Sequence, residues 1–318
     1  MPNELITHNH SDDDIDRRGF LKCMAWAGTG MLWAASGGLV ASRMLKAAEA
    51  QILTSGTDFS FVQISDSHVG FNKEANKDVL GTLRQAVAKI NALPAPPDFI
   101  LHTGDLSHLS EPEEFDTLEQ ILRECRTGKI FYVPGEHDVL NDNGKQYLQR
   151  FGAGTKGDGW FSFDHKGTHF VGLNNVRQIR EGGLGVLGED QLAWMDDNLK
   201  AISDSTPVVV FAHVPLWEVY PQWGWGTDDG ARALGYLKRF GSVTVLNGHI
   251  HQVMKKTEGN ATFHTAMSTA FPQPVPGTAP KPGPMKVDPG ILRSVLGITE
   301  VSYSEGKHAL AVVDETLA

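Results

Sequence analysis

The chain has 318 residues, of which 41% are hydrophobic and 21% are charged, so it contains enough apolar material for a large core. Its formal net charge is −10, and the sequence has no cluster of Lys and Arg that would neutralise a phosphate backbone. This charge balance argues against polymeric nucleic acid as a partner.

The first 50 residues have the features of an export signal. Arg17 and Arg18 precede Gly-Phe-Leu-Lys, a weakly apolar run over residues 23–42 and the small-residue cleavage pattern at residues 48–50. The pattern resembles a bacterial twin-arginine signal, although Asp16 stands where Ser or Thr is usual. The alternative is an uncleaved membrane anchor, but four glycines make this run a poor span.

The expected cleavage divides the chain into a signal peptide, residues 1–50, and one domain, residues 51–318. Of the two cysteines, Cys23 leaves with the signal, so Cys125 has no partner for a disulfide within the mature chain. The mature chain remains acidic. We expect the twin-arginine export machinery to deliver it folded to the periplasm or the cell exterior, with membrane contact only through an uncleaved signal.

Three short apolar runs, each followed by polar residues, open the expected domain. Residues 59–64 read as a buried strand that ends near Asp66 and His68, and residues 99–101 read as a second strand that ends near Asp105. Residues 130–133 form a third run, which leads through a Pro-Gly turn to residues 136–138, Glu-His-Asp.

Two helices are expected between these strands. Apolar residues recur at helical spacing over residues 79–90, and prolines from Pro94 onward end that helix. Residues 110–113 have the form of a capping box that opens a second helix, with an apolar face over residues 115–122. Alternation of strands and helices at this spacing predicts parallel pairing with right-handed crossovers.

Further strands follow in the second half of the domain. Residues 160–174 predict an antiparallel hairpin, in which His165 and His169 are expected to be turn and strand residues. A helix is expected over residues 192–202, followed by a fourth buried strand at 207–211 that ends at His213. The fifth strand, residues 243–246, leads to His249 and His251. Short strands are also expected around Phe263 and over residues 310–313.

Two segments show no periodicity. Residues 272–289 hold seven prolines, which predicts an extended loop packed on the domain surface, with a flexible insertion as the alternative. Residues 217–225 contain four aromatic side chains together with Pro and Gly, which indicates a loop. Because this loop follows His213, it is either one wall of a cleft or packed against the proline-rich segment, and the sequence does not favour one over the other.

The polar residues after the five strands are expected to meet. In open parallel sheets, ligands bind beyond the carboxyl ends of the strands, where all of these side chains lie. Carboxylates and imidazoles without thiolates suit Fe, Mn, Zn or Co, and seven ligands are too many for one small ion. Two ions about 3.5–4 Å apart would use them all. The predicted ligands are Asp66, His68, Asp105, Glu136, His213, His249 and His251.

The spacing of these residues resembles the calcineurin-like metallophosphoesterase family. Its five blocks, D-x-H, G-D, G-N-H-[DE], H and G-H-x-H, correspond in order to residues 66–68, 104–105, 135–138, 213 and 248–251. The blocks extend over most of the expected domain, which makes the match specific. The resemblance implies an α/β fold, a four-layer sandwich of two mixed β-sheets flanked by helices with a dinuclear metal site at the strand carboxyl ends.

The resemblance also implies a role for each ligand. One ion would bind Asp66, His68 and His251, and the other would bind the residue at position 136, His213 and His249, with Asp105 as the bridge. His137 would donate a proton to the leaving oxygen, and Asp138 would hold the other ring nitrogen of His137. His102 and His108, on either side of Asp105, are either supporting groups or ordinary strand and loop residues.

One position departs from the family pattern. The family usually has Asn where this chain has Glu136, so the carboxylate ligands number three instead of two. With a bridging hydroxide, the ligand set would carry a charge of −4. We therefore expect a trivalent ion, Fe(III), at that position; a Glu136 side chain that turns away from its ion is the alternative.

The implied activity is hydrolysis of a phosphate monoester or diester by a hydroxide that bridges the two ions, with a small-molecule phosphoester as substrate. An exported enzyme would meet envelope or extracellular phosphoesters. The competing interpretation is a binding protein on the same fold that has lost turnover. The complete ligand set and His137 favour the enzyme.

Overall fold

The computed structural model describes residues 31–36, 39–44, 59–304 and 310–318. Most of the predicted export signal therefore lies outside the described residues. Within the signal segment, strands β1 (Met31–Ser36) and β2 (Leu39–Met44) pair in an antiparallel manner. None of the helices in the described residues is both long and apolar enough to span a membrane.

The first sheet has five strands in the order β15-β14-β3-β4-β5. Strands β3, β4 and β5 are parallel, as predicted, and β14 and β15 add antiparallel pairs along the β3 edge. The bounds are β3 Phe59–Ile64, β4 Phe99–His102, β5 Ile130–Tyr132, β14 Gly297–Tyr303 and β15 Ala311–Thr316. The sequence analysis missed β14, which joins the carboxyl-terminal part of the chain to β3.

The second sheet has six strands in the order β12-β13-β11-β10-β7-β6. Its four inner strands are parallel, and β6 and β12 are antiparallel strands at the two edges. The bounds are β6 Phe161–His165, β7 Thr168–Gly172, β10 Val208–Ala212, β11 Val243–Asn247, β12 Lys255–Glu258 and β13 Ala261–Thr265. The predicted hairpin is therefore confirmed, and β12 is a strand that the sequence analysis missed.

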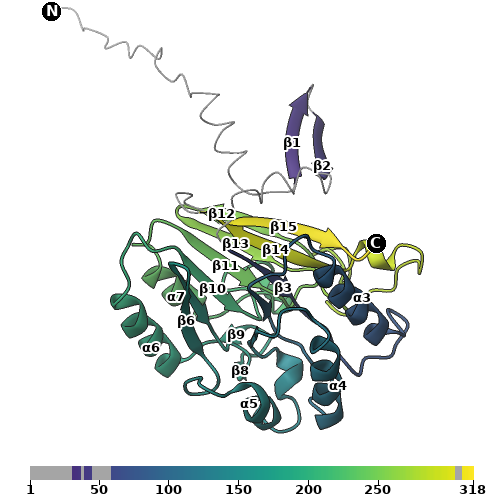
Figure 1. The fold of residues 1–318 in the computed structure, drawn as a ribbon, viewed down its shortest axis with the longest axis horizontal. Coiled ribbons are helices and arrows are strands. Elements are labelled where there is room, and N and C mark those ends of the chain that lie inside the picture. Colours follow the sequence, from purple (N-terminus) through teal and green to yellow (C-terminus); the bar gives the residue numbers. More distant parts are fainter. Residues whose placement is uncertain (1–30, 37–38, 45–58, 305–309) are drawn as a thin grey trace, which may run out of the picture.

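Helices cover the outer face of each sheet (Figure 1). Helices α3, α4 and α5 pack on the five-stranded sheet, whereas α6 and α7 pack on the six-stranded sheet. Their bounds are α3 Val79–Asn91, α4 Pro112–Leu122, α5 Lys145–Phe151, α6 Glu189–Lys200 and α7 Gly230–Tyr236. The short helices α5 and α7 were not predicted.

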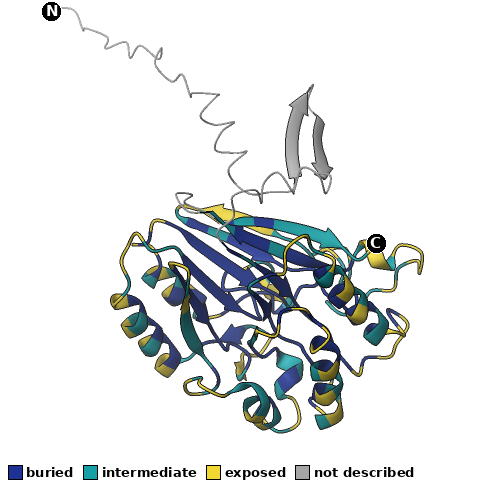
Figure 2. Cartoon of the chain, in the orientation of Figure 1, coloured by how far each residue is buried: buried dark blue, intermediate teal, exposed yellow. Residues whose placement is uncertain are grey.

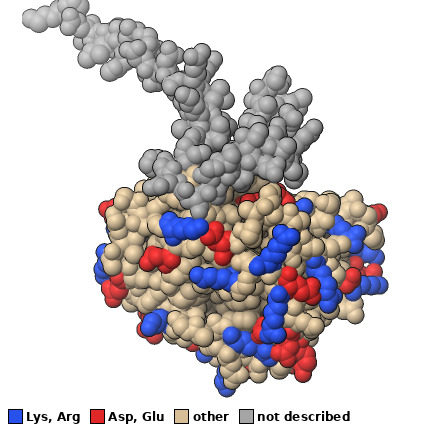
Figure 3. All heavy atoms as spheres, viewed as in Figure 1, with Lys and Arg blue, Asp and Glu red and all other residues tan. Residues whose placement is uncertain are grey.

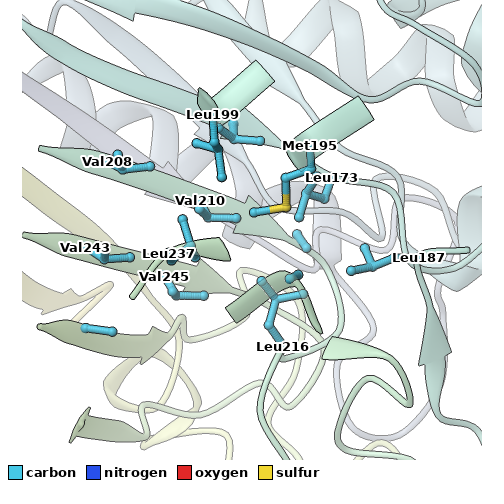
Figure 4. Packing of buried hydrophobic residues seen from close by; sticks show 14 of the residues in the cluster. Leu173, Leu187, Met195, Leu199, Val208, Val210, Leu216, Leu237, Val243 and Val245 are labelled. Carbon is cyan, nitrogen blue, oxygen red and sulfur yellow. The ribbon is translucent and has the colours of Figure 1, made fainter. Parts of the chain in front are cut away.

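The apolar residues form three main layers of core, which confirms the four-layer sandwich. Between the sheets, phenylalanines such as Phe61 and Phe99 of one sheet meet Phe170 and Phe211 of the other. Outer cores lie between each sheet and its helices; in Figure 4, Met195 of α6 lies against Val210 of β10. Figure 2 shows the inner strands of the sheets buried, and the edge strands and outward helix faces more exposed. Burial of this apolar area supplies most of the stabilisation.

One predicted helix start is wrong by one residue. Helix α4 begins at Pro112 with Glu111 as its N-cap, and the residue three positions later that bonds back is Glu114, not Glu113. The Glu114 carboxylate also accepts hydrogen bonds from the backbone N–H groups of His108 and Leu109. The helix start is thereby tied to the loop that carries His108.

The remaining elements are short. Strands β8 (Gln178–Ile179) and β9 (Gly185–Val186) form a small antiparallel pair. Short 3₁₀ helices are η1 (Glu136–Val139), η2 (Pro221–Trp223) and η3 (Leu292–Ser294). The proline-rich segment, residues 272–289, contains no helix or strand, as predicted for a loop.

Candidate metal centre

The predicted ligands meet at one edge of the sandwich. Asp66 and His68 follow β3, Asp105 follows β4, and Glu136 lies in η1 after β5. The other sheet contributes His213 after β10 and two histidines after β11. Because both sheets place the carboxyl ends of their parallel strands at the same edge, side chains up to about 180 residues apart in sequence become neighbours.

Four ligands form a buried group that we call the inner cluster: Asp66, His68, Asp105 and His251. Nε2 of His251 lies 3.2 Å from Oδ1 of Asp66 and 3.2 Å from Nε2 of His68. The side chains of all four are at most 2% exposed. Burial, together with the neighbouring rings of His137 and His251, holds the pKa of His68 well below its usual value, so that ring stays neutral.

Three ligands form a second group, the outer cluster: Glu136, His213 and His249. The Glu136 carboxylate lies 2.8 Å from Nε2 of His213 through Oε2 and 2.9 Å from Nδ1 of His249 through Oε1. Burial would raise the pKa of Glu136, but His249 and His213 hold it well below its usual value, so Glu136 is ionised. The Glu136 side chain turns toward the cluster and not away from it.

Asp105 stands between the two clusters. Its Oδ2 atom lies 3.4 Å from Nε2 of His68 and 3.4 Å from Nε2 of His213. Its other oxygen, Oδ1, accepts a hydrogen bond of 2.9 Å from the backbone N–H of His137, which fixes the orientation of the carboxylate. The position of Oδ2 is the one that a bridging ligand requires.

The backbone at the strand ends is strained. Five of the seven predicted ligands have φ in the left-handed region: 53° at Asp66, 40° at His68, 52° at Asp105, 70° at His249 and 55° at His251. Residues other than glycine rarely adopt this conformation, and each instance costs on the order of 1–3 kcal/mol. The surrounding sheets must therefore stabilise this arrangement, which is typical of functional sites.

Two glycines of the family blocks allow the strand ends to approach one another. A Cβ atom on Gly135 would lie 2.1 Å from Oδ1 of Asp105. A Cβ atom on Gly248 would lie 2.0 Å from Oγ of Ser65 and 2.7 Å from Oδ2 of Asp66. Any side chain at either position would displace a residue of the inner cluster.

The donor atoms fit divalent or trivalent cations. Oε2 of Glu136, Nε2 of His213 and Nδ1 of His249 are buried and make no hydrogen bond of acceptable geometry within the described residues, although they lie close together. A cation shared by these three atoms would satisfy them, because they converge and have no hydrogen-bond partners of their own. The mixture of imidazole and carboxylate suits Zn, Fe, Mn or Co.

Backbone carbonyls orient two of the ligand histidines. Nδ1 of His213 lies 2.7 Å from the carbonyl oxygen of Thr103, and Nδ1 of His251 lies 2.5 Å from that of Phe271. Each carbonyl accepts the Nδ1 proton, so that in the neutral ring Nε2 is the unprotonated nitrogen, and it is directed at the cluster. His68 differs, because its Nδ1 pairs with another imidazole, Nδ1 of His108, at 3.5 Å.

His137 and His108 form a stacked pair beside the inner and outer clusters. Their rings lie 4.9 Å apart with an angle of 15° between the planes, and Nδ1 of His137 donates a hydrogen bond of 2.6 Å to the carbonyl oxygen of His108. Nε2 of His137 is therefore the ring nitrogen left for a substrate. Burial would lower the pKa of His137, but the carboxylates of Asp105 and Glu136 raise it above its usual value.

The predicted role of Asp138 is wrong. Its carboxylate does not contact the ring of His137 but accepts hydrogen bonds from the backbone N–H groups of Leu106, Ser107 and Gly135, at 2.8–3.1 Å. The tight turn of η1 directs Asp138 into the interior, where it ties the loop after β4 to the loop after β5. Burial and the charge of Asp105 raise the pKa of Asp138 to about 7, against the three N–H groups that favour its ionised form.

Three histidines outside the two clusters, His102, His165 and His169, have structural partners. His102 is buried at the end of β4, and its Nε2 lies 2.9 Å from Oγ of Ser67, within the loop that carries the first ligands. His165 contacts Asp98, and His169 lies between Asp164 and Asn198. His165 lies in strand β6 and not in the turn, whereas His169 is a strand residue, as predicted.

A cleft of about 260 Å³ opens over both clusters. Its lining includes His108, His137 and members of both clusters, together with Lys73, Trp223 and residues 282–284 of the proline-rich segment. Of the aromatic residues in the loop 217–225, Trp217 and Trp225 are buried, whereas Trp223 is only partly buried. This loop is thus a wall of the cleft through Trp223 and Trp225, and it packs into the core through Trp217 and Trp225.

The sequence analysis missed Gln273. Its side-chain Nε2 donates a hydrogen bond of 2.8 Å to the carbonyl oxygen of His249, and its Oε1 accepts one of 2.9 Å from the N–H of Gly283. One glutamine therefore links a ligand of the outer cluster to the proline-rich wall. A single Gln within a loop gives no signal in the sequence.

Comparison with known proteins agrees with this geometry. Residues 59–253 match the model of a family described as calcineurin-like phosphoesterase, which is more than half of the chain. The chain is 25% identical to a 3′,5′-cyclic-nucleotide phosphodiesterase of Nostoc, over 67% of this chain and 79% of the relative. It is 28% identical to a serine/threonine-protein phosphatase of Danio rerio, over 61% of this chain and 70% of the relative.

A solved structure shows the same fold. The structure of a dimetal phosphatase from Danio rerio superposes with a TM-score of 0.60, covering 82% of this chain and 97% of the other at 16% identity. At this level of identity the likeness establishes the fold and not the substrate.

Proposed function

Because the chain belongs to the calcineurin-like phosphoesterase family, we propose that it hydrolyses small phosphate monoesters or diesters at a centre of two metal ions. One observation carries the proposal: Oδ2 of Asp105 lies 3.4 Å from a histidine nitrogen of each cluster. A carboxylate shared in this way brings the two ion positions close enough to act on one phosphoryl group.

Each cation would bind its own set of ligands. Asp66, His68 and His251 would hold one cation, the outer cluster would hold the other, and Asp105 would bind both. Two bound cations supply Lewis-acid stabilisation of the phosphoryl oxygens and a nucleophile derived from water near neutral pH. The buried, strained loops keep the ligands in place, so little reorganisation is needed when a substrate binds.

His137 supplies the proton for the leaving group in this proposal. Its Nδ1 is occupied by the carbonyl of His108, and the ring lines the cleft next to the bridging Asp105. A proton on Nε2 would therefore be available to the departing alkoxide. Asp138 supports this arrangement through the backbone, because it fixes the turn from which His137 projects.

Glu136 supports a further proposal, that the outer cluster holds Fe(III). The ionised Glu136 adds a third carboxylate to Asp66 and Asp105, and the extra negative charge is best balanced by a trivalent cation. Metal analysis of protein matured in its own host, compared with Glu136→Asn, tests this. The wild-type protein should contain iron and the variant clearly less. Equal iron in both would contradict the proposal.

The substrate is proposed to be a small molecule. A cleft of about 260 Å³ admits a compact ester, and on the face shown in Figure 3 the Lys and Arg side chains are interspersed with Asp and Glu. No broad basic surface on that face would track a nucleic acid. Among the relatives are a phosphodiesterase and a phosphatase, so both ester classes belong in the test.

A panel of chromogenic phosphomonoesters and phosphodiesters, assayed with Mn, Fe, Zn and Co in turn, tests the function. We expect turnover of at least one ester class that depends on added metal. If metal-replete protein hydrolyses none of the esters, the chain is a binding protein on this fold.

The cellular location of the protein is proposed from the sequence. Residues 1–50 would act as a twin-arginine signal, and the domain over residues 51–318 would work in the periplasm or outside the cell. A fusion of residues 1–50 to a reporter protein should be exported, and replacement of Arg17 and Arg18 by Lys should retain it in the cytoplasm. Export that is unaffected by this change would contradict the proposal.

A further inference from the structure

Two walls of the cleft have no part in holding the metal ions or moving a proton. One is the partly buried indole of Trp223, and the other is formed by Pro282 and Pro284 on either side of Gly283. Both line the same cavity as residues of the inner and outer clusters. A group attached to a phosphate bound at the metals would therefore extend into the cavity that these walls enclose.

The first wall is rigid. The loop closes through backbone hydrogen bonds in which Trp225 accepts from Val219 at 2.8 Å and from Tyr220 at 3.0 Å and donates back to Tyr220 at 3.2 Å. Trp225 is 1% exposed and anchors the loop in the core. The indole of Trp223 makes edge-on contacts with two rings, Trp225 at a centroid distance of 5.1 Å and Tyr220 at 5.2 Å. Its position is thus fixed before a ligand arrives.

The second wall is tied to the metal centre. Gln273 bonds at one end to the backbone of His249, in the outer cluster, and at the other to the N–H of Gly283. Gln252 adds a hydrogen bond of 3.1 Å to the carbonyl oxygen of Pro274. The two prolines therefore keep a fixed position relative to the metal ligands.

We propose that Trp223 and the prolines hold a flat aromatic group of the ester, so that the preferred substrates are small aromatic phosphoesters. This inference rests on the proposed phosphoesterase function. A prearranged indole and prolyl surface binds a planar ring with little loss of conformational entropy. The cleft volume of about 260 Å³ is close to the lower end for small-molecule sites, which suits one ring with its phosphate.

Lys73 adds a separate, non-selective attraction. It is the one Lys or Arg side chain among the described residues that line the cleft, and it is exposed. Its charge favours any anionic ester, whether or not a ring is attached. The two contributions can therefore be measured independently.

Binding of two phosphonates to the Mn-loaded protein tests the inference, because the phosphorus–carbon bond resists this hydrolysis. Calorimetry should show that phenylphosphonate binds wild-type protein about tenfold more tightly than methylphosphonate. Trp223→Ala should reduce this ratio to about two, without changing the affinity for methylphosphonate, and Trp223→Phe should retain most of it. Lys73→Gln should weaken both ligands equally.

Trp194→Leu is the matched control, since Trp194 is partly buried but does not line the cleft. This variant should keep the wild-type ratio. A ratio near one in the wild type, or a ratio that Trp223→Ala leaves unchanged, would overturn the inference even if esters are hydrolysed. A ratio that behaves as expected in protein without turnover would keep the aromatic ring site but reject the proposed function, and the claim about preferred substrates with it.

Discussion

The inner and outer clusters use the same kinds of ligand but differ in burial. The inner cluster is at most 2% exposed, whereas in the outer cluster the side chains of Glu136 and His249 are 24% and 13% exposed. The inner ligands follow the buried strands β3, β4 and β11. Glu136 instead lies on a short 3₁₀ helix after the partly buried, three-residue strand β5.

This difference indicates that two cations bound at these clusters would differ in how readily they exchange with solvent. The inner ligands are enclosed by both sheets, which makes that position rigid and difficult for water to reach. Ligands of both clusters line the cleft, but the greater exposure of Glu136 and His249 makes the outer position more accessible to water. Substrate exchange and metal exchange should both occur on the outer side.

The strongest test of this comparison removes the residue that the two clusters share. Asp105→Asn should lower kcat/KM on the order of a thousandfold and reduce bound metal from two ions to one or fewer, because neither cluster keeps its full ligand set. Activity assays and elemental analysis would measure this. Two tightly bound ions in the variant would show that Asp105 does not bridge.

The next test concerns His137, which lies beside both clusters. His137→Ala should lower the rate about a hundredfold on alkyl esters, because their leaving groups need a proton. It should lower the rate little on nitrophenyl esters, because the nitrophenolate leaving group needs no proton. Rates on a series of esters with graded leaving-group pKa would measure it. An equal loss on all esters would assign His137 to substrate binding.

Partial metal removal compares the clusters directly. Titration of the two-metal protein with a chelator should remove the outer ion first, with affinities about tenfold or more apart, because water reaches the outer ligands. Glu136→Asn should alter only the weaker step. Loss of both ions in one cooperative step would contradict the proposed difference between the clusters.

His108 offers a smaller test that concerns the inner cluster alone. Since its Nδ1 lies 3.5 Å from Nδ1 of His68, His108→Ala should weaken binding of the inner ion about tenfold and leave binding of the outer ion unchanged. His108→Asn, which retains an acceptor, should restore part of the affinity. If both variants weaken both ions equally, His108 acts only through the fold.

The smallest effect on the metal centre is expected from replacing Asp314. This residue joins the two sheets away from the edge of the sandwich where the ligands meet. Burial would raise the pKa of Asp314, but His264 and Lys255 hold it below its usual value. The stabilisation is therefore present above the unfolded pKa of about 3.8 and is lost as pH falls through the lower folded pKa.

Asp314→Asn should reduce the free energy of unfolding by about 2–3 kcal/mol at pH 7, and by less toward acid pH. Denaturant unfolding at several pH values would measure it, while both metal affinities stay as in the wild type. A constant loss across the acid range would exclude the ion pairs as its cause.

The sequence was informative where local patterns decide the structure. The buried run over residues 59–64 coincides with β3, and the polar residues after each parallel strand do meet at one rim. Strand direction and the position of the polar residues were enough for this, because carboxyl ends of parallel strands share an edge. The likeness of the ligand spacing to a known family supplied the pairing of residues into two clusters.

The sequence was uninformative where contacts with backbone groups far away along the chain determine the structure. The carboxylate of Asp138 binds N–H groups about 30 residues away, which no local pattern indicates, so its role was predicted wrongly. Strand β14 lacks a clean alternation of apolar and polar residues, and pairing with β3 defines it. The link from Gln273 to His249 likewise depends on how a loop folds back onto the site.

The central claim is that side chains from both sheets hold two cations that share Asp105. Anomalous diffraction from crystals of the metal-loaded protein tests it most directly. Two peaks should appear about 3.5–4 Å apart, one against Asp66, His68 and His251 and the other against Glu136, His213 and His249. A single peak, or peaks away from these residues, would contradict the account.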